Sequence, residues 1–186
     1  MKEISVREAR KIHFRDNGLP LDGGYEDTWT PLKAGPLTVY LFNSQSRKAS
    51  VQLHDIHHIV TGFHSDLCGE AEISAWELAA GIHDKYFAGA IGLLAVFYGS
   101  ILYPRRTFAA YLIGKNSKTL YNRNISEALL NQSLSDLQRE LLPAKAPKAP
   151  KASGRYYAGF CGLFLISSLP FVGVLFVAMM LWQRFF

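Results

Sequence analysis

Two histidines and two acidic residues stand at spacings that suit a metal site. His54, Asp55 and His58 lie within one short stretch, LHDIHHIV, and Glu70 follows further along the chain. Residues four apart on a helix share a face, so His54 and His58 can offer two imidazoles to one ion. Asp55 lies about 100° round the same helix, so it can reach the ion from the side or orient an imidazole. These residue types favour the binding of a divalent metal.

The flanking sequence predicts two helices joined by a short connection. The first is expected to run to about Thr61, where Gly62 can adopt the left-handed conformation that ends a helix. The second is expected to end near Gly81. Small polar residues that can cap a helix precede both, namely Asn43 or Ser44 and then Ser65 or Asp66. The two segments should therefore form an αα-hairpin.

A turn near His64 would bring Glu70 opposite the histidines. His58 comes before this position by the same number of residues as Glu70 follows it, so antiparallel packing places the two at similar height. The expected metal ligands, and catalytic residues, are His54, Asp55, His58 and Glu70. Imidazoles with carboxylates suit Zn²⁺ or Fe²⁺ better than Ca²⁺ or Mg²⁺, which prefer oxygen-rich shells. Such a set leaves a position open for water or substrate.

Other polar residues near the motif have less direct expected roles. His57 is on a different face from His54, which favours a supporting or surface position. Glu77 shares the face of Glu70 but lies about 10 Å further along the axis, so it is interpreted as a supporting carboxylate. Glu72 points away from Glu70 and is expected to be solvated or ion-paired.

The motif resembles that of a known family. His54, Asp55, two residues, His58, eleven residues and Glu70 reproduce the HDxxHx₁₁E signature of the coenzyme Q (ubiquinone) biosynthesis protein 4 family. The stretches HHIVTGF and GEAEISAWE also look like that family, and the resemblance covers roughly residues 40–142. It implies an all-helical, membrane-associated protein that binds a metal, usually zinc, through these four residues.

The same resemblance implies a function in ubiquinone biosynthesis. The expected substrate is a polyprenylated benzoate, whose C1 carboxyl is removed and replaced by a hydroxyl. The alternative is a non-catalytic scaffold that binds lipid and organises other quinone-biosynthesis enzymes, with a structural metal. Expected partners are therefore membrane lipid, the quinone precursor and those enzymes, and self-association is compatible with the sequence.

A second feature is an uncharged run of 28 residues between Arg155 and Arg184. As a helix it would reach roughly 42 Å, more than the hydrocarbon layer of about 30 Å, so it predicts a transmembrane helix. Basic residues before the run outnumber the one after it, which favours a globular part on the cytoplasmic or matrix side of a bacterial or mitochondrial inner membrane. They are Lys145, Lys148, Lys151 and Arg155.

The fold class is predicted to be all-α, in four parts. Residues 1–42 form a loop-rich segment packed on the domain, and 43–142 form the helical metal-binding domain. Residues 143–155 form an extended Pro/Lys/Ala spacer that holds the domain away from the transmembrane helix 156–183. The stretch LTVYLF, 37–42, could be a strand but has no evident partner, so it is interpreted as extended chain.

Two further segments of the domain are apolar or amphipathic. The uncharged run 86–104 suits a buried or membrane-leaning helix, or alternatively a short span, and it could line a groove for a prenyl tail. Arg105 and Arg106 follow it and could contact an anionic head group or simply the membrane surface. Residues 124–142 have apolar positions three, four and seven apart, which predicts one amphipathic helix.

Composition and motif content argue against several other classes of protein. The net charge of +5 comes largely from the spacer, which favours an anionic membrane surface, and no nucleic-acid-binding motif is present. Two cysteines in unlike settings fit a reducing compartment. Histidine-rich membrane hydroxylases share the HxxHH pattern but draw histidines from several clusters, and His-Asp phosphohydrolases need a further His and Asp; this chain suits neither well.

Overall fold

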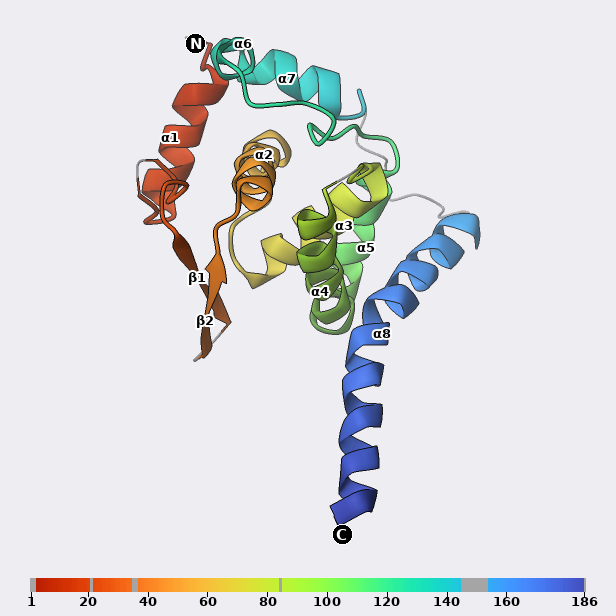
Figure 1. Ribbon diagram of the computed structural model, residues 1–186. Coiled ribbons are helices and arrows are strands. Elements are labelled where there is room, and N and C mark those ends of the chain that lie inside the picture. The colour runs from red at the N-terminus through yellow and green to blue at the C-terminus, as the bar shows by residue number, and fades with distance from the viewer. Residues whose placement is uncertain (1–2, 21, 35–36, 84, 145–153, 186) are drawn as a thin grey trace.

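The described residues form eight helices and one two-stranded antiparallel sheet (Figure 1). The structure is a computed structural model and describes residues 3–20, 22–34, 37–83, 85–144 and 154–185. It confirms the expected all-α class, since 69% of it is helical. The elements are α1 (Val6–Asp16), β1 (Trp29–Ala34), β2 (Leu37–Phe42), α2 (Gln45–Thr61), α3 (Leu67–Ala80), α4 (Tyr86–Leu102), α5 (Pro104–Gly114), α6 (Glu127–Asn131), α7 (Leu134–Leu141) and α8 (Gly154–Phe185).

Local sequence determines the ends of the helices that carry the site. The Ser44 side chain accepts a hydrogen bond at the start of α2, and Gly62, with φ of 74°, ends it. Asp66 caps α3 in the same way. Ser5 and Glu8 form a reciprocal capping box at the start of α1. These ends confirm the sequence-based expectations for α2 and α3, so the αα-hairpin forms as predicted.

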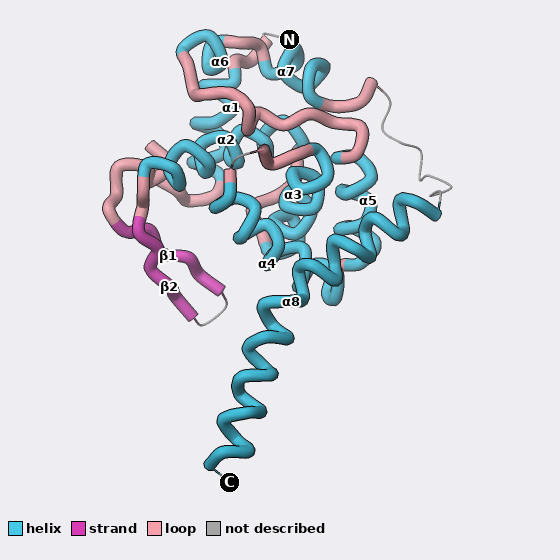
Figure 2. Tube along the Cα trace, turned by 45° about the vertical axis from the view of Figure 1, so that its right-hand side comes forward, coloured by secondary structure: helices cyan, strands magenta, loops and turns pink. Residues whose placement is uncertain are grey.

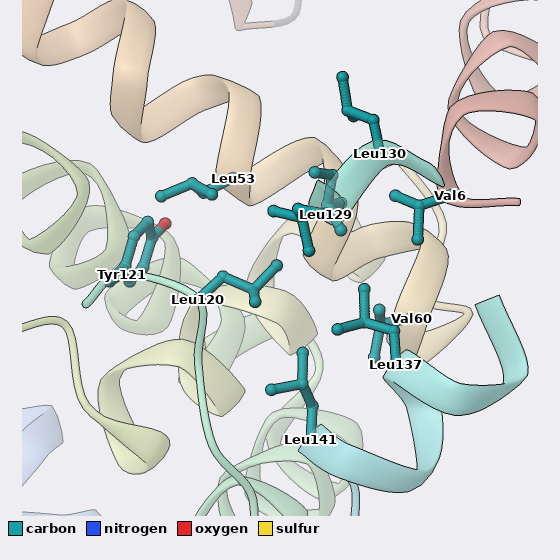
Figure 3. Packing of buried hydrophobic residues seen from close by; sticks show 10 residues of the cluster. Val6, Leu53, Val60, Leu120, Tyr121, Leu129, Leu130, Leu137 and Leu141 are labelled. Carbon is teal, nitrogen blue, oxygen red and sulfur yellow. The ribbon is translucent and has the colours of Figure 1, made fainter. Parts of the chain in front are cut away.

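Two hydrophobic clusters hold α2 and α3 in place. Figure 3 shows the first, in which apolar side chains of α2, α6 and α7 converge with Leu120 and Tyr121. The second surrounds the fully buried Trp76 of α3 and draws on α4 and α5. Burial of such side chains contributes roughly 1.5 to 3 kcal/mol each. The hairpin is therefore fixed from both sides.

The expectation of one helix over 124–142 is wrong, because the structure has two short helices, α6 and α7. Between them the chain pairs with the residues before α1. Val6 N donates to Gln132 O at 2.9 Å and Leu134 N donates to Ile4 O at 2.9 Å. These bonds replace the helical ones that a continuous helix would make there.

The interpretation of residues 37–42 as unpaired extended chain is also wrong. It is strand β2 and pairs with β1, with Trp29 opposite Phe42 (Figure 2). Pro31 lies inside β1, which obscures the strand in the sequence. A proline is tolerated there because a two-stranded sheet consists only of edge strands.

α4 and α8 pack together on one side of the domain. α4 has 17 residues and contacts α3, α5 and α8, and it is a shorter apolar helix than the candidate span of α8. The Phe97 ring of α4 stacks on Phe171 of α8, with centroids 4.1 Å apart, and Phe108 of α5 stacks on Tyr157 at 4.7 Å. α8 thus starts against the domain instead of standing away from it. Of the expected spacer 143–155, residues 145–153 lie outside the described residues.

α8 is long and apolar enough to cross a membrane. Its candidate span runs from Gly154 to Val174, with mean hydropathy 1.7, and only 6% of the most apolar part is buried against the protein. Pro170 lies inside the helix, which is visibly bent in Figures 1 and 2. A proline removes one helical hydrogen bond and crowds the preceding turn, so a bend is its expected effect.

A substitution at Gly114 tests the close contact between α3 and α5. A Cβ at this position would overlap the Trp76 carbonyl oxygen and lie 2.9 Å from the Ala79 Cβ. We expect Gly114→Ala to destabilise the domain by about 1 to 3 kcal/mol, because backbone rather than a flexible side chain must move. Thermal unfolding of the full chain in detergent, followed by circular dichroism, measures this.

Gly92→Ala is the matched control. Its Cβ would lie 3.5 Å from the Leu78 Cδ1, an ordinary contact. Alanine is favoured over glycine inside a helix by up to about 1 kcal/mol, so this variant should unfold at the wild-type temperature or above it. Equal stability of the two variants would contradict the tight α3–α5 contact.

Candidate metal centre

Three of the four expected ligands converge between α2 and α3. His54 and His58 of α2 and Glu70 of α3 form a group that could hold a metal ion. The two histidine Nε2 atoms are 3.1 Å apart. Glu70 Oε2 is 3.4 Å from His54 Nε2, and Oε1 is 3.3 Å from His58 Nε2. Residues four apart on one helix thus face a carboxylate at the start of the next.

These separations suit a tetrahedral ion. Ligand bonds of about 2.0 to 2.1 Å place neighbouring ligand atoms of a tetrahedron about 3.3 to 3.4 Å apart. The Nε2 atoms of His54 and His58 face each other, and two imidazole lone pairs repel at 3.1 Å. A proton or a cation must therefore lie between them. A metal ion satisfies both nitrogens and the Glu70 carboxylate together.

The second nitrogen of each imidazole is held by another group. His54 Nδ1 lies 2.9 Å from Glu77 Oε1, and His58 Nδ1 lies 3.0 Å from the Phe63 carbonyl oxygen. Both acceptors require Nδ1–H, which leaves the Nε2 lone pairs for the site. This pairing of imidazole with carboxylate or carbonyl orients ligands in metal proteins and raises their basicity.

His57 supports the site indirectly, through Glu77. Its Nε2 accepts from the Leu120 backbone N–H at 2.8 Å, so its Nδ1 carries the proton and donates to Glu77 Oε1 at 2.7 Å. The side chain is fully buried, in edge contact with the Trp76 ring. Burial lowers the pKa of His57 more than Glu77 raises it, so the imidazole is neutral. His57 thus holds Glu77, which holds His54.

The buried Glu77 and the partly exposed Glu70 both stay ionised. Burial alone would raise the pKa of Glu77, but His54 and His57 more than offset this, and the pKa lies well below its usual range. For Glu70, hydrogen bonds from His54 and His58 overcome burial in the same way. Burial disfavours a charged His54, yet the two carboxylates raise its pKa well above the usual value. The centre therefore attracts positive charge, whether proton or metal.

Asp55, the fourth expected ligand, is not part of this group. Its Oδ2 accepts a hydrogen bond from the Tyr25 hydroxyl, from the loop before β1. Burial and the Asp55 carboxylate raise the Tyr25 pKa far above its usual range, so the phenol keeps its proton. In the structure Asp55 ties the N-terminal segment to α2.

Arg105 and Arg106, the expected substrate contacts, do not line the cavity beside the centre. Arg106 makes a two-pronged ion pair with Glu72 of α3, at 2.9 Å and 2.7 Å. Glu72 is therefore ion-paired, one of the two roles expected for it. Arg105 is exposed at the start of α5.

His13 was not expected at the site. It reaches the centre from α1, and its ring stacks on His58 with centroids 5.7 Å apart. Burial and the neighbouring His58 lower the pKa of His13. A groove of about 400 Å³ runs past both residues, between α1 and the α2–α3 connection. No spacing in the sequence reveals a contact between residues this far apart in the chain.

A small cavity reaches the centre from the side of α4. It has a volume of about 70 Å³, room for a few water molecules. His54, Glu70 and Glu77 line its polar side, and Phe87, Ala88 and Ile91 of α4 are among the residues on its apolar side. The cavity therefore has polar side chains of the centre on one side and apolar side chains of α4 on the other.

Comparisons with family models, with curated proteins and with solved structures find no match to this chain.

Replacing His58 tests the metal centre directly. We expect the full chain, purified in detergent, to carry stoichiometric zinc or iron by elemental analysis, and His58→Ala to lose it, because two ligands cannot hold the ion tightly. His64→Ala should keep its metal, since His64 is exposed in the α2–α3 connection and outside the ligand group. Wild-type protein that takes up no metal would contradict the assignment.

Glu77→Gln tests the support of His54. The amide keeps the shape of the carboxylate but loses its charge, so His54 is less basic and its tautomer less strongly held. Loss of such a supporting partner typically weakens metal binding 10- to 100-fold. Competition with a chelating dye measures this, and an unchanged affinity would show that Glu77 does not act on the metal.

Proposed function

We propose that this protein is a metal-dependent enzyme of ubiquinone biosynthesis that acts at a membrane on a polyprenylated benzoate. The observation that carries the proposal is the three-ligand centre beside an apolar cavity. The HDxxHx₁₁E pattern, of which His54, His58 and Glu70 meet in space, adds the family resemblance. In this proposal zinc or iron is the resident ion.

The ligand set supports a catalytic rather than a purely structural centre. Structural zinc sites have closed four-ligand shells, whereas catalytic ones have three protein ligands and an open position. Within the described chain the group consists of three residues, His54, His58 and Glu70. The cavity adjoins His54 and Glu70, so a substrate oxygen has a path to the open position.

The apolar wall supports a lipid-like substrate. Phe87 and Ile91 line the cavity from α4, the helix that also contacts α8. A prenyl chain lying along α4 would replace water against apolar side chains, which is favourable by roughly 25 cal/mol per Å². The cavity is smaller than an aromatic ring, so its α4 side chains must move to admit one. We also propose that α8 crosses the membrane and brings the cavity close to lipid.

The proposed reaction removes the C1 carboxyl as CO₂ and leaves a hydroxyl in its place. This is a two-electron oxidation, for which we propose dioxygen as the acceptor: one substrate, one water and one dioxygen give the hydroxylated ring, CO₂ and hydrogen peroxide. A bound divalent ion supplies Lewis-acid stabilisation of developing negative charge. Glu77 and His57 keep His54 oriented, and the apolar wall excludes bulk water.

A membrane-tethered scaffold with a structural metal is the alternative, and the same experiment separates the two. Full-length protein in lipid nanodiscs, loaded with zinc or with iron, is given a short-chain prenylated hydroxybenzoate labelled at the carboxyl carbon. An enzyme releases labelled CO₂ and consumes dioxygen. A scaffold binds the compound and releases nothing, an outcome that would overturn the enzymatic proposal.

Ile91→Trp should block the prenyl end of the cavity. We expect roughly tenfold or greater loss of kcat/KM, because a ligand displaced by about 1 Å reacts far more slowly, with metal content unchanged. Leu94→Trp is the matched control on the same helix, since Leu94 is 42% exposed and does not line the cavity. Equal activity of both variants would place the substrate elsewhere.

A further inference from the structure

The β1–β2 hairpin presents large aromatic side chains to solvent. Trp29, Tyr40 and Phe42 are 56%, 65% and 60% exposed. Trp29 and Phe42 are opposite each other, with ring centroids 5.5 Å apart, and Tyr40 is two residues from Phe42. Because side chains alternate along a strand, all three lie on one face of the hairpin. Three exposed aromatic rings on one face indicate a contact surface.

Little of the protein supports this hairpin. β1 and β2 pair with each other, and neither makes an extended contact with any other described element. Of the hairpin side chains that the structure describes, which are those of Trp29, Thr30, Thr38, Tyr40 and Phe42, none belongs to either hydrophobic cluster. An isolated two-stranded hairpin is marginally stable in water. An outside surface that covers the aromatic face would stabilise it.

The base of the hairpin is nevertheless firmly joined to the domain. Asn43 N donates to the Thr28 carbonyl at 2.9 Å, and the Asn43 side chain donates to the Asp27 carbonyl at 2.8 Å. Arg47 of α2 donates to the Thr30 hydroxyl at 3.1 Å. The bonds of Asn43 close the base of the hairpin, and the bond of Arg47 joins β1 to the first turn of α2.

The direction of the hairpin is shared with the membrane helix. In Figures 1 and 2, which differ by a turn about the vertical axis, the hairpin and the C-terminal half of α8 both extend from the same side of the domain. Because this turn does not change vertical position, both views place the hairpin and this half of α8 toward the lower side of the domain. A bilayer entered by the C-terminal half of α8, beyond the part that packs on α4 and α5, would lie on the side toward which the hairpin points.

We propose that the aromatic face of the hairpin, formed by Trp29, Tyr40 and Phe42, is a second membrane contact that rests in the interface of the bilayer entered by α8. Tryptophan and tyrosine are the residues enriched at this depth. The occupant is lipid rather than a protein partner or a second copy, because α8 already brings a bilayer to that side. The proposal depends on the membrane insertion of α8 proposed above.

A second contact gives the domain a defined orientation. One helix alone leaves the domain free to rotate about the membrane normal and to tilt. Two linked contacts on one molecule restrict tilt, and the second forms at a high effective concentration. The cavity beside α4 then stays at a constant height above the lipid.

The three tryptophans of the chain allow a direct test. Trp29 is in the hairpin, Trp76 is fully buried in the core, and Trp182 is in α8. Full-length protein is placed in nanodiscs of phosphatidylcholine and phosphatidylglycerol, with or without lipid brominated near the top of the acyl chain. Bromine quenches tryptophan emission only at short range, so each variant reports the position of the tryptophans it retains.

Trp182→Phe retains Trp29 and Trp76, and we expect brominated lipid to quench roughly half of its emission. The double variant Trp29→Phe/Trp182→Phe retains only Trp76 and should not be quenched. If Trp182→Phe is quenched no more than the double variant, Trp29 does not contact lipid and the proposal is overturned.

Trp29→Phe retains Trp76 and Trp182 and reports on α8 alone. Quenching of this variant without quenching of Trp182→Phe would mean that α8 inserts and the hairpin does not. Quenching of neither would mean that α8 itself does not insert, and both proposals would fail. Circular dichroism of each variant confirms that the phenylalanine substitutions leave the fold intact.

Discussion

The buried carboxylate of Glu77 is the interaction on which the centre depends. A carboxylate in an apolar interior is costly unless it is paired and hydrogen-bonded. Glu77 meets this requirement by accepting from both His54 and His57, which joins α3 to α2 at one point. His57 in turn accepts from the backbone of Leu120, so the segment before α6 is part of the same network. The orientation of His54 Nε2 toward His58 and Glu70 is a consequence of this arrangement.

The hydrophobic clusters determine where the helices lie, and the polar network around Glu77 determines where the protons lie. The clusters set the distance between α2 and the rest of the domain, but side chains such as Leu53 and Trp76 do not specify a proton position. The hydrogen bonds of Glu77 and of the Phe63 carbonyl specify it. Apolar packing brings the two imidazoles near Glu70, and the polar network selects the tautomers that can bind a cation.

Features governed by neighbours in the chain could be predicted from the sequence. The caps of α2 and α3, the shared face of His54 and His58, and the height of Glu70 across the hairpin all follow from helix geometry. Contacts between distant segments could not be predicted in this way. Asp55 has the spacing of a ligand, yet a phenol from a distant loop accounts for its position. His13 reaches the site only through the packing of α1 on α2.

The pairing of residues 4–6 with residues 132–134 closes the domain from its first helix to its last. α1 cannot complete this contact until the chain near Gln132 has been synthesised, and α8 begins only some twenty residues later. Contacts of such wide sequence separation slow folding, because the loop between them must be closed before they form. On the ribosome, the contact that closes the domain and the apolar helix α8 therefore become available at nearly the same stage of synthesis.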